Sequence, residues 1–162
     1  MTFGQTDALA RAVVEWLNNH VMDFCTPIAA QRRFRLMDDL PALPDHESPA
    51  AVDVFPGGET GDREGISTAF ASSYAIHIVI QQQLSGASDK EAQCALLAQL
   101  RSEIIEGLKL RAFDLTATAV HPVKNVFLAQ IRSSDKGLYN LSKLMELHVF
   151  ESDTILVFKA AC

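Results

Sequence analysis

The sequence Ser73-Tyr-Ala-Ile-His-Ile-Val-Ile-Gln-Gln82 decides the fold. One set of alternate positions in it carries Tyr74, Ile76, Ile78 and Ile80, and the other set carries alanine, histidine, valine and glutamine. Large β-branched and aromatic residues at a period of two predict a β-strand with one face in the core. The alanine and the valine make the second face partly apolar, so we expect partial cover on that side as well.

One helix is predicted after this strand and another near the N-terminus. Ser88-Asp-Lys-Glu91 is a capping box, in which the serine and the glutamate satisfy backbone donors at a helix start. It predicts a long helix over residues 89–109, with its apolar stripe at Cys94, Leu97, Leu100, Ile104 and Leu108. Thr6 is expected to cap a helix over residues 6–20, in which Trp16 anchors the apolar stripe.

Further strands are predicted over residues 28–36, 51–55, 117–121, 126–132 and 144–159. In the last of these, Glu151 and Asp153 fall between apolar residues on the same face. Two carboxylates are costly to bury in the middle of an apolar strand face. We therefore expect a bulge or a bend near residues 150–153.

The order of the predicted elements is helix, strands, helix, strands. This order predicts an α+β fold with two layers, a mostly antiparallel sheet covered by one long helix and an N-terminal helix. A chain of 162 residues fits one domain with its own core. We assign residues 1–162 to that single domain.

Negative charge is concentrated in residues 38–64, which hold eight of the twenty acidic residues and one basic residue, a net charge of −7. The same segment carries four of the six prolines and the Gly57–Gly58 pair. We expect long acidic or glycine-rich loops over residues 37–50 and 56–71, the second of them mobile until a partner orders it. Such loops are commoner as docking or channel-lining surfaces than as catalytic sites.

The composition argues against several classes of protein. The acidic balance disfavours nucleic-acid binding, because the one basic cluster, Arg32-Arg-Phe-Arg35, is short. The three cysteines are far apart and are expected to be reduced thiols of a cytosolic chain. We see no signal-peptide pattern and no apolar run that approaches a membrane span. We expect neither a cofactor nor a metal, since no phosphate loop and no metal-ligand spacing occurs.

The histidines and paired carboxylates are the only candidates for catalysis. His77 and His148 lie in predicted strands at alternate-face positions and could meet across a sheet. Glu151 and Asp153 form a pair of carboxylates, but a general acid and base must converge on a pocket. Because no such constellation is visible, we interpret the histidines as ordinary strand-face residues and expect no enzyme.

A series of short patterns along nearly the whole chain carries a family resemblance. The series consists of Gln31-Arg-Arg-Phe-Arg35, Asp38-Asp-Leu40, Val52-Asp-Val-Phe-Pro56, Tyr74-Ala-Ile-His-Ile-Val-Ile-Gln81, the capped helix from Ser88 to Lys109, and Leu144–Phe150 with Ile155–Phe158. In this order it resembles the tail terminator (tail completion, minor tail protein) family of long-tailed bacteriophages, with its "V-x-V-x-P" and "Y-x-I-x-I" strands. The proline that usually follows the first strand is absent, since Leu36 and Met37 stand there.

The resemblance implies a structural virion protein of the tail or neck, assembled in the host cytoplasm. Family members form a ring, usually of six subunits, at the head-proximal end of the tail tube. The ring ends polymerisation of the tube protein and offers a docking face to the head–tail connector, and genomic DNA passes through its lumen without specific binding. The resemblance implies no membrane partner.

The charge pattern adds a hypothesis about which residues line the interfaces or the lumen. The candidates are Arg33, Arg35, Asp38, Asp39, Asp45, Glu47, Glu59, Asp62, Arg63 and Glu64. If the acidic loops face the lumen, like-charge repulsion lets DNA slide through without sticking.

Three alternatives remain open. The chain could be another neck component, such as a head-completion or stopper protein, which contacts the portal adaptor rather than the tube protein. It could be an enzyme or small-molecule binder on an α+β fold, which predicts a deep pocket with convergent polar groups. It could also be a cellular dimerising module, which would be a dimer and not a ring.

Overall fold

The computed structural model describes residues 3–33, 43–63, 70–84, 90–121, 123–133 and 139–160. Within them the chain forms the helices α1 (Gln5–Asn19), α2 (Lys90–Lys109) and α3 (Leu141–Leu147), and a short 3-10 helix, η1 (Val21–Asp23). The strands are β1 (Ile28–Arg32), β2 (Ala50–Arg63), β3 (Phe70–Gln83), β4 (Ala112–Phe113), β5 (Val126–Ser133) and β6 (Val149–Ala160). The predicted α+β class is confirmed.

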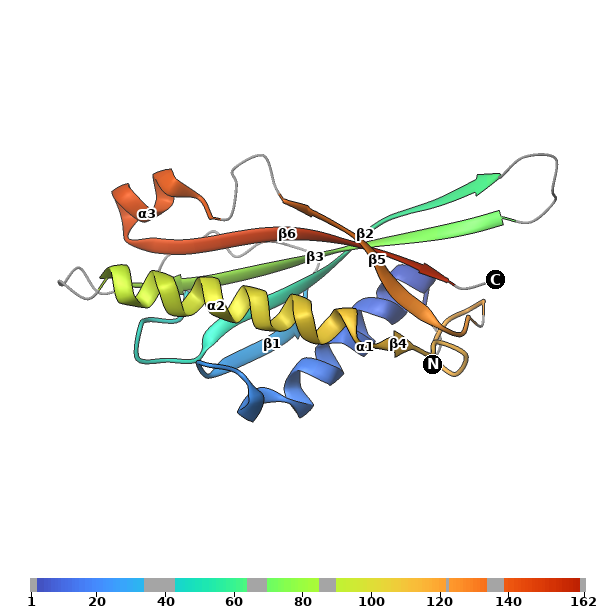
Figure 1. Ribbon diagram of the computed structural model, residues 1–162, viewed down its shortest axis with the longest axis horizontal. Helices are drawn as coiled ribbons and strands as arrows, with labels where there is room; N and C mark the ends of the chain where they lie inside the picture. The colour runs from blue at the N-terminus through green and yellow to red at the C-terminus, as the bar shows by residue number, and fades with distance from the viewer. Residues whose placement is uncertain are drawn as a thin grey trace.

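The strands form one mixed, twisted sheet in the order β1-β2-β3-β6-β5-β4 (Figure 1). β1 pairs with β2 in parallel, and every other neighbouring pair is antiparallel. The centre is the long pairing of β3 with β6, which runs without a register shift from Ser73–Lys159 to Gln83–Val149.

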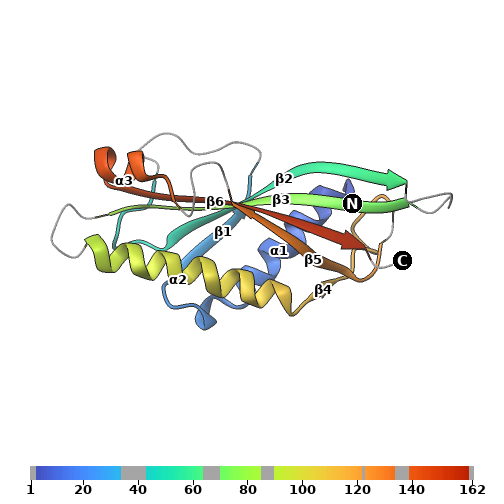
Figure 2. The same ribbon diagram turned by 45° about the horizontal axis from the view of Figure 1, so that its top comes forward.

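The helices lie on both sides of the sheet. α1 and α2 cover one face, and α3 lies against the other side beside β6 (Figures 1 and 2). The alternate positions of β3 behave as predicted: Tyr74, Ile76, Ile78 and Ile80 are buried in the core under α1 and α2. The side chains at the intervening positions therefore point to the opposite face, which we name the outer face.

The two longest helices are close to their predicted bounds, but the start of α1 differs. Gly4 is the N-cap of α1 and makes no side-chain capping bond, while Thr6 lies inside the helix and is buried. The predicted cap at Thr6 is therefore wrong. Ser88 of the predicted capping box lies outside the described residues, and α2 is described from Lys90.

The predicted loop over residues 56–71 is wrong for its described parts, residues 56–63 and 70–71. These residues extend β2 and β3 into a long hairpin, and residues 64–69 lie outside the described residues. The glycines sit at a register shift between Pro56 and Glu59, after which pairing resumes. A Cβ on Gly57 would lie 2.7 Å from the carbonyl oxygen of Ala75, so glycine is needed for this close approach of two strands.

The predicted strand over residues 144–159 is wrong in its first part. Asn140 accepts a hydrogen bond from the N–H of Lys143 and caps α3, and His148 ends the helix in a left-handed conformation with φ 54°. β6 then pairs with β3 in unbroken register, so the expected bulge near residues 150–153 is absent. The shift lies instead in β5, between Leu128 and Gln130.

Three smaller expectations also differ. The strand predicted over residues 117–121 is a turn with one isolated bridge, from Phe3 to Ala119. The two-residue strand β4 was not predicted. Of the loop expected over residues 37–50, residues 37–42 lie outside the described residues, while Leu43 is buried and Ala50 begins β2.

Candidate interaction surfaces and a polar site on the sheet

Asp45 and Glu47 lie in an exposed turn between β1 and β2. The Asp45 carboxylate accepts hydrogen bonds from the backbone N–H groups of Glu47 and Ser48, at 3.0 and 2.9 Å. Hydrogen bonds from Ser48 and from the Glu47 backbone hold the pKa of Asp45 below its usual value. The turn is therefore an ordered, negatively charged surface feature.

Arg33 is committed to a partner within the fold. Its Nε donates to Asp53 Oδ1 at 2.9 Å, and the Asp53 side chain is only 1% exposed. Burial raises the pKa of Asp53, and the hydrogen bond and charge of Arg33 oppose that rise. Arg33 thus compensates a buried carboxylate, and its role at an interface remains a prediction.

The other candidate residues divide between the hairpin and undescribed segments. The backbone of β2 carries Glu59, Asp62 and Arg63 in the distal half of the hairpin. Four candidates lie outside the described residues: Arg35, Asp38, Asp39 and Glu64.

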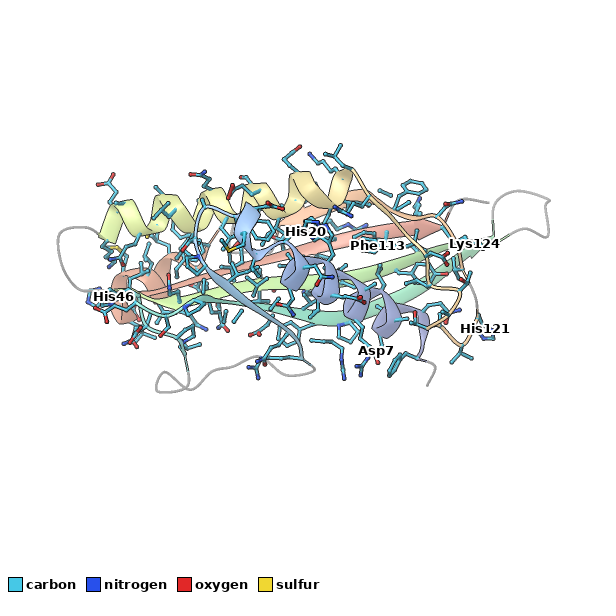
Figure 3. All side chains as sticks on the ribbon, turned by 90° about the horizontal axis from the view of Figure 1, so that it is seen from below. Asp7, His20, His46, Phe113, His121 and Lys124 are labelled. Atoms are coloured by element: carbon cyan, nitrogen blue, oxygen red, sulfur yellow. The ribbon has the colours of Figure 1, made fainter. Side chains whose placement is uncertain are left out.

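The structure does not bring the described acidic candidates into one cluster. The turn that contains Asp45 is bonded to the end of β3, where the Gln82 side chain donates to the carbonyl oxygen of Asp45. Asp62 pairs with Ala71 at the start of β3. At about 3.3 Å per residue, β3 separates these two ends by roughly 36 Å. Figure 3 accordingly shows His46, beside Asp45, at the end of the molecule away from the tip of the β2–β3 hairpin.

The distal hairpin extends beyond the strands that flank its base. β1 pairs only with residues 50–54 of β2, and the pairing of β6 with β3 ends at Ser73. Residues 60–63 and 70–72 therefore form a two-stranded arm, at the upper right of Figure 1. Among the described strands, no third strand pairs with residues 60–63 or 70–72.

The two borders of the sheet differ in their cover. At the β1 border, the side-chain amide of Asn18 in α1 donates to the carbonyl oxygen of Ala30 at 3.3 Å. At the other border, β4 pairs only with Val126 and Phe127, and no described strand covers β5 from residue 128 to 133. Phe127 and Ile131 of β5 are 41% and 37% exposed. Among the described strands, this part of β5 therefore has a partner on one side only, and an unpaired strand edge is a surface on which another chain can pair.

Polar side chains form rows across the outer face. In one row, Gln81 of β3 is opposite Glu151 of β6, and its side-chain amide donates to that carboxylate at 2.9 Å. Lys143 of α3 donates to the same carboxylate at 2.8 Å. The two carboxylates that seemed incompatible with a straight strand therefore have partners from neighbouring elements: Lys143 and Gln81 for Glu151, and His77 for Asp153.

His77 and Asp153 form a half-exposed pair beside a groove. His77 Nδ1 lies 3.2 Å from Asp153 Oδ1, and the side chains are 35% and 38% exposed. The hydrogen bond to Asp153 raises the pKa of His77, burial opposes it, and the charge of Asp153 adds to the rise. The groove has a volume of about 300 Å³ and is lined by Phe55, Pro56, Gly57, His77, Val79 and Asp153.

The two histidines that we expected could meet belong to different places. His148 lies at the end of α3, where its Nδ1 is 2.9 Å from Lys90 Nζ. His77 pairs across the sheet with Ile155, which is seven positions from His148. At about 3.3 Å per residue the separation is roughly 23 Å along β6. A site that uses both imidazoles is therefore excluded.

Among the described residues, no group of three or more His, Cys, Asp and Glu side chains is arranged to hold a metal ion. The described helices include none that is long and apolar enough to cross a membrane. No protein-family model matches the chain, and no curated protein matches it significantly.

Proposed function

We propose that this chain is a structural virion protein that forms a ring at the head-proximal end of a phage tail. The observation that carries the proposal is the β2–β3 arm, which leaves the sheet, together with the uncovered border of β5. Their combination supplies two different unpaired strand surfaces on one chain. The series of sequence patterns that resembles the tail terminator family supports the same function.

Two different surfaces on one chain favour head-to-tail assembly. A contact between unlike surfaces repeats from copy to copy, and it closes into a ring when the rotation per subunit divides the circle. Closure pairs every open strand border and leaves none for uncontrolled aggregation. We propose six subunits per ring, each with a two-layer core of the sheet under α1 and α2.

The proposed partners are the tail tube protein on one side and the head–tail connector on the other. The acidic turn and the acidic hairpin lie at opposite ends of β3, so a ring would carry two separate negative zones. Negative charge along the path of DNA would prevent adhesion during passage. Reversing the charge of Asp38, Asp39, Asp45 and Glu47 should therefore impair DNA passage, and unchanged assembly and passage would remove this part of the proposal.

The role at the tail is tested by adding the purified chain to its tube protein during polymerisation. A terminator binds one end of each tube and stops its growth, so mean tube length should fall as the ratio of chain to tube protein rises. A stopper or other neck protein would leave tube length unchanged and bind the portal adaptor instead. Tubes of unchanged length, with the chain bound to the adaptor, would favour that alternative.

The groove beside His77 favours a second candidate function, a small-molecule binder or enzyme. Asp153 orients the imidazole, as the orienting carboxylate does in general-base catalysis. The groove is shallow, and its described lining contains no serine, threonine, cysteine or lysine. A ligand or substrate whose turnover is lost in His77→Gln, with the fold retained, would support this function over the structural one.

A further inference from the structure

A second cavity, of about 580 Å³, lies on the other side of the sheet, between the end of α1 and the C-terminal half of α2. It is separate from the strand surfaces that carry the proposed function. Its lining residues are Trp16, His20, Asp23, Phe24, Glu103, Glu106, Gly107, Leu110 and Arg111. The residues from α2 recur three and four positions apart, which places them on one face of that helix. Figure 3 shows His20 at the end of α1, next to α2.

The cavity has an aromatic wall that depends on one glycine. A Cβ on Gly107 would lie 2.6 Å from Trp16 Cη2, so only glycine lets the indole pack against the backbone of α2. The ring of Phe24 meets Trp16 edge to face, with centroids 6.0 Å apart. Two aromatic rings, set at 81° to each other, thus form the apolar part of the cavity lining.

The basic groups of the cavity are already engaged. The guanidinium of Arg111 lies over the Trp16 ring, 5.1 Å from its centroid, and its Nη2 is 3.3 Å from His20 Nε2. His20 Nδ1 lies 2.8 Å from the carbonyl oxygen of Trp16. With Nδ1 donating to that oxygen, Nε2 accepts from Arg111, and the positive charge of Arg111 is held against the wall.

The acidic groups are less well compensated. Glu106 pairs with Lys109 at 2.8 Å, but neither Asp23 nor Glu103 forms an ion pair with any described residue. Glu103 Oε1 accepts the backbone N–H of Cys25, at 2.9 Å, and the Cys25 thiol also interacts with the Glu103 carboxylate, so its described partners are neutral groups. The C-terminal end of α2 adds partial negative charge at the same place. Aromatic walls and uncompensated carboxylates together suit a cation with an apolar body.

We propose that this cavity binds an organic cation, an amidinium, guanidinium or ammonium group attached to a flat or apolar body. The apolar body packs against Trp16 and Phe24, and the cationic group faces Glu103 and Asp23. The same chemistry is present in a free aromatic amidine and in an arginine side chain of a peptide. This site is independent of ring formation.

The test uses Trp16, the only tryptophan of the chain, as a built-in fluorescent probe. Benzamidine is titrated against the full chain, with benzamide and benzoate as neutral and anionic controls of the same size, and with free N-acetyltryptophanamide to correct for absorbance. We expect a saturable change with benzamidine and binding at least about tenfold weaker for both controls, which corresponds to about 1.4 kcal/mol. Equal or tighter binding of benzoate, or no saturable change with benzamidine, would overturn the proposal.

Two variants locate the binding. Glu103→Gln keeps an oxygen that can accept from the Cys25 backbone, so the fold should persist while benzamidine affinity falls severalfold. Glu91→Gln removes the same charge from an exposed position of α2, roughly 18 Å away along the helix, and should leave affinity unchanged. Equal losses in the two variants would mean a nonspecific charge effect and would overturn the site.

A second ligand distinguishes the two sources of the cation. N-acetylarginine methylamide carries the guanidinium of a peptide side chain without an aromatic ring. If N-acetylarginine methylamide displaces benzamidine at a similar concentration, the site is assigned to an arginine of a protein partner. Binding of benzamidine alone assigns it to a free aromatic cation.

Discussion

Replacing Lys143 by methionine tests how the outer face accommodates a buried carboxylate. The Glu151 side chain is 9% exposed, and its Oε1 accepts from Lys143 Nζ at 2.8 Å and from Gln81 Nε2 at 2.9 Å. Lys143→Met keeps the length and the apolar stem of the side chain but removes the charge. Glu151 then retains only amide donors in a nearly inaccessible position.

The size of the effect follows from the exposure of the two partners. Removing one member of a fully buried ion pair costs about 3–5 kcal/mol, because the other charge is left without compensation. The Lys143 side chain is 29% exposed, so water replaces part of its contribution. We expect a loss of about 2 kcal/mol in the free energy of unfolding. For a chain of this length that corresponds to about 4–8 °C in Tm.

The assay is urea unfolding followed by circular dichroism, with Lys159→Met as the matched control. Lys159 is an exposed residue of β6 with no ion pair to a described residue, so its variant should stay within about 0.5 kcal/mol of the parent. Adding Glu151→Gln to Lys143→Met should recover part of the loss, because no buried charge then remains. A Lys143→Met variant as stable as the Lys159→Met control would refute this account of Glu151.

Two further predictions concern the outer face and the hairpin. Asp153→Asn should lower the pKa of His77 toward its ordinary value in an NMR titration. Because that pKa is raised in the folded state, the pair stabilises the fold below about pH 6.5. This stabilisation is lost as the pH rises through the raised pKa. The difference in stability between parent and variant should thus be larger at about pH 6 than at about pH 9. It should stay below about 1 kcal/mol because both side chains are about a third exposed. A difference that does not change with pH would contradict this role of the pair. Gly57→Ala should cost about 1–3 kcal/mol in urea unfolding, because its Cβ meets the backbone of Ala75 at 2.7 Å. A Gly57→Ala variant as stable as the parent would argue against the close approach of the strands.

Local patterns predicted the elements that make up the core. The alternation in β3 and the helical stripe of α2 each depend on residues close in sequence, and each face points as the period requires. Trp16 was predicted as a core anchor and is buried. These elements can be predicted from the sequence because each is stabilised mainly by burying one apolar face, whose residues recur at a regular spacing.

The end of the chain was mispredicted because its partners come from distant elements. Met145 and Leu147 continue the period of β6 by coincidence, and both are exposed on α3. The carboxylates of β6 are compensated by Lys143, Gln81 and His77, a set that no local pattern connects. The N-cap at Asn140 was the signal that could have located α3.

The candidate interaction surface was predicted only in part. The acidic segment is continuous in sequence, but β2 carries its second half away from the first. The glycines that indicated a loop instead mark a register shift within a hairpin, a distinction that depends on the partner strand. The cavity beside Trp16 could not be foreseen, since it needs the packing of Gly107 against a helix far away in sequence.

The mass and symmetry of the particle in solution test the central claim most directly. Light scattering and averaged electron micrographs are recorded for the chain alone and for the chain mixed with its tube protein. We expect a closed ring of six chains of 17.7 kDa in at least the mixture, bound to the end of a tube. A monomer or a simple dimer in both samples, with no ring at any tube end, would contradict it.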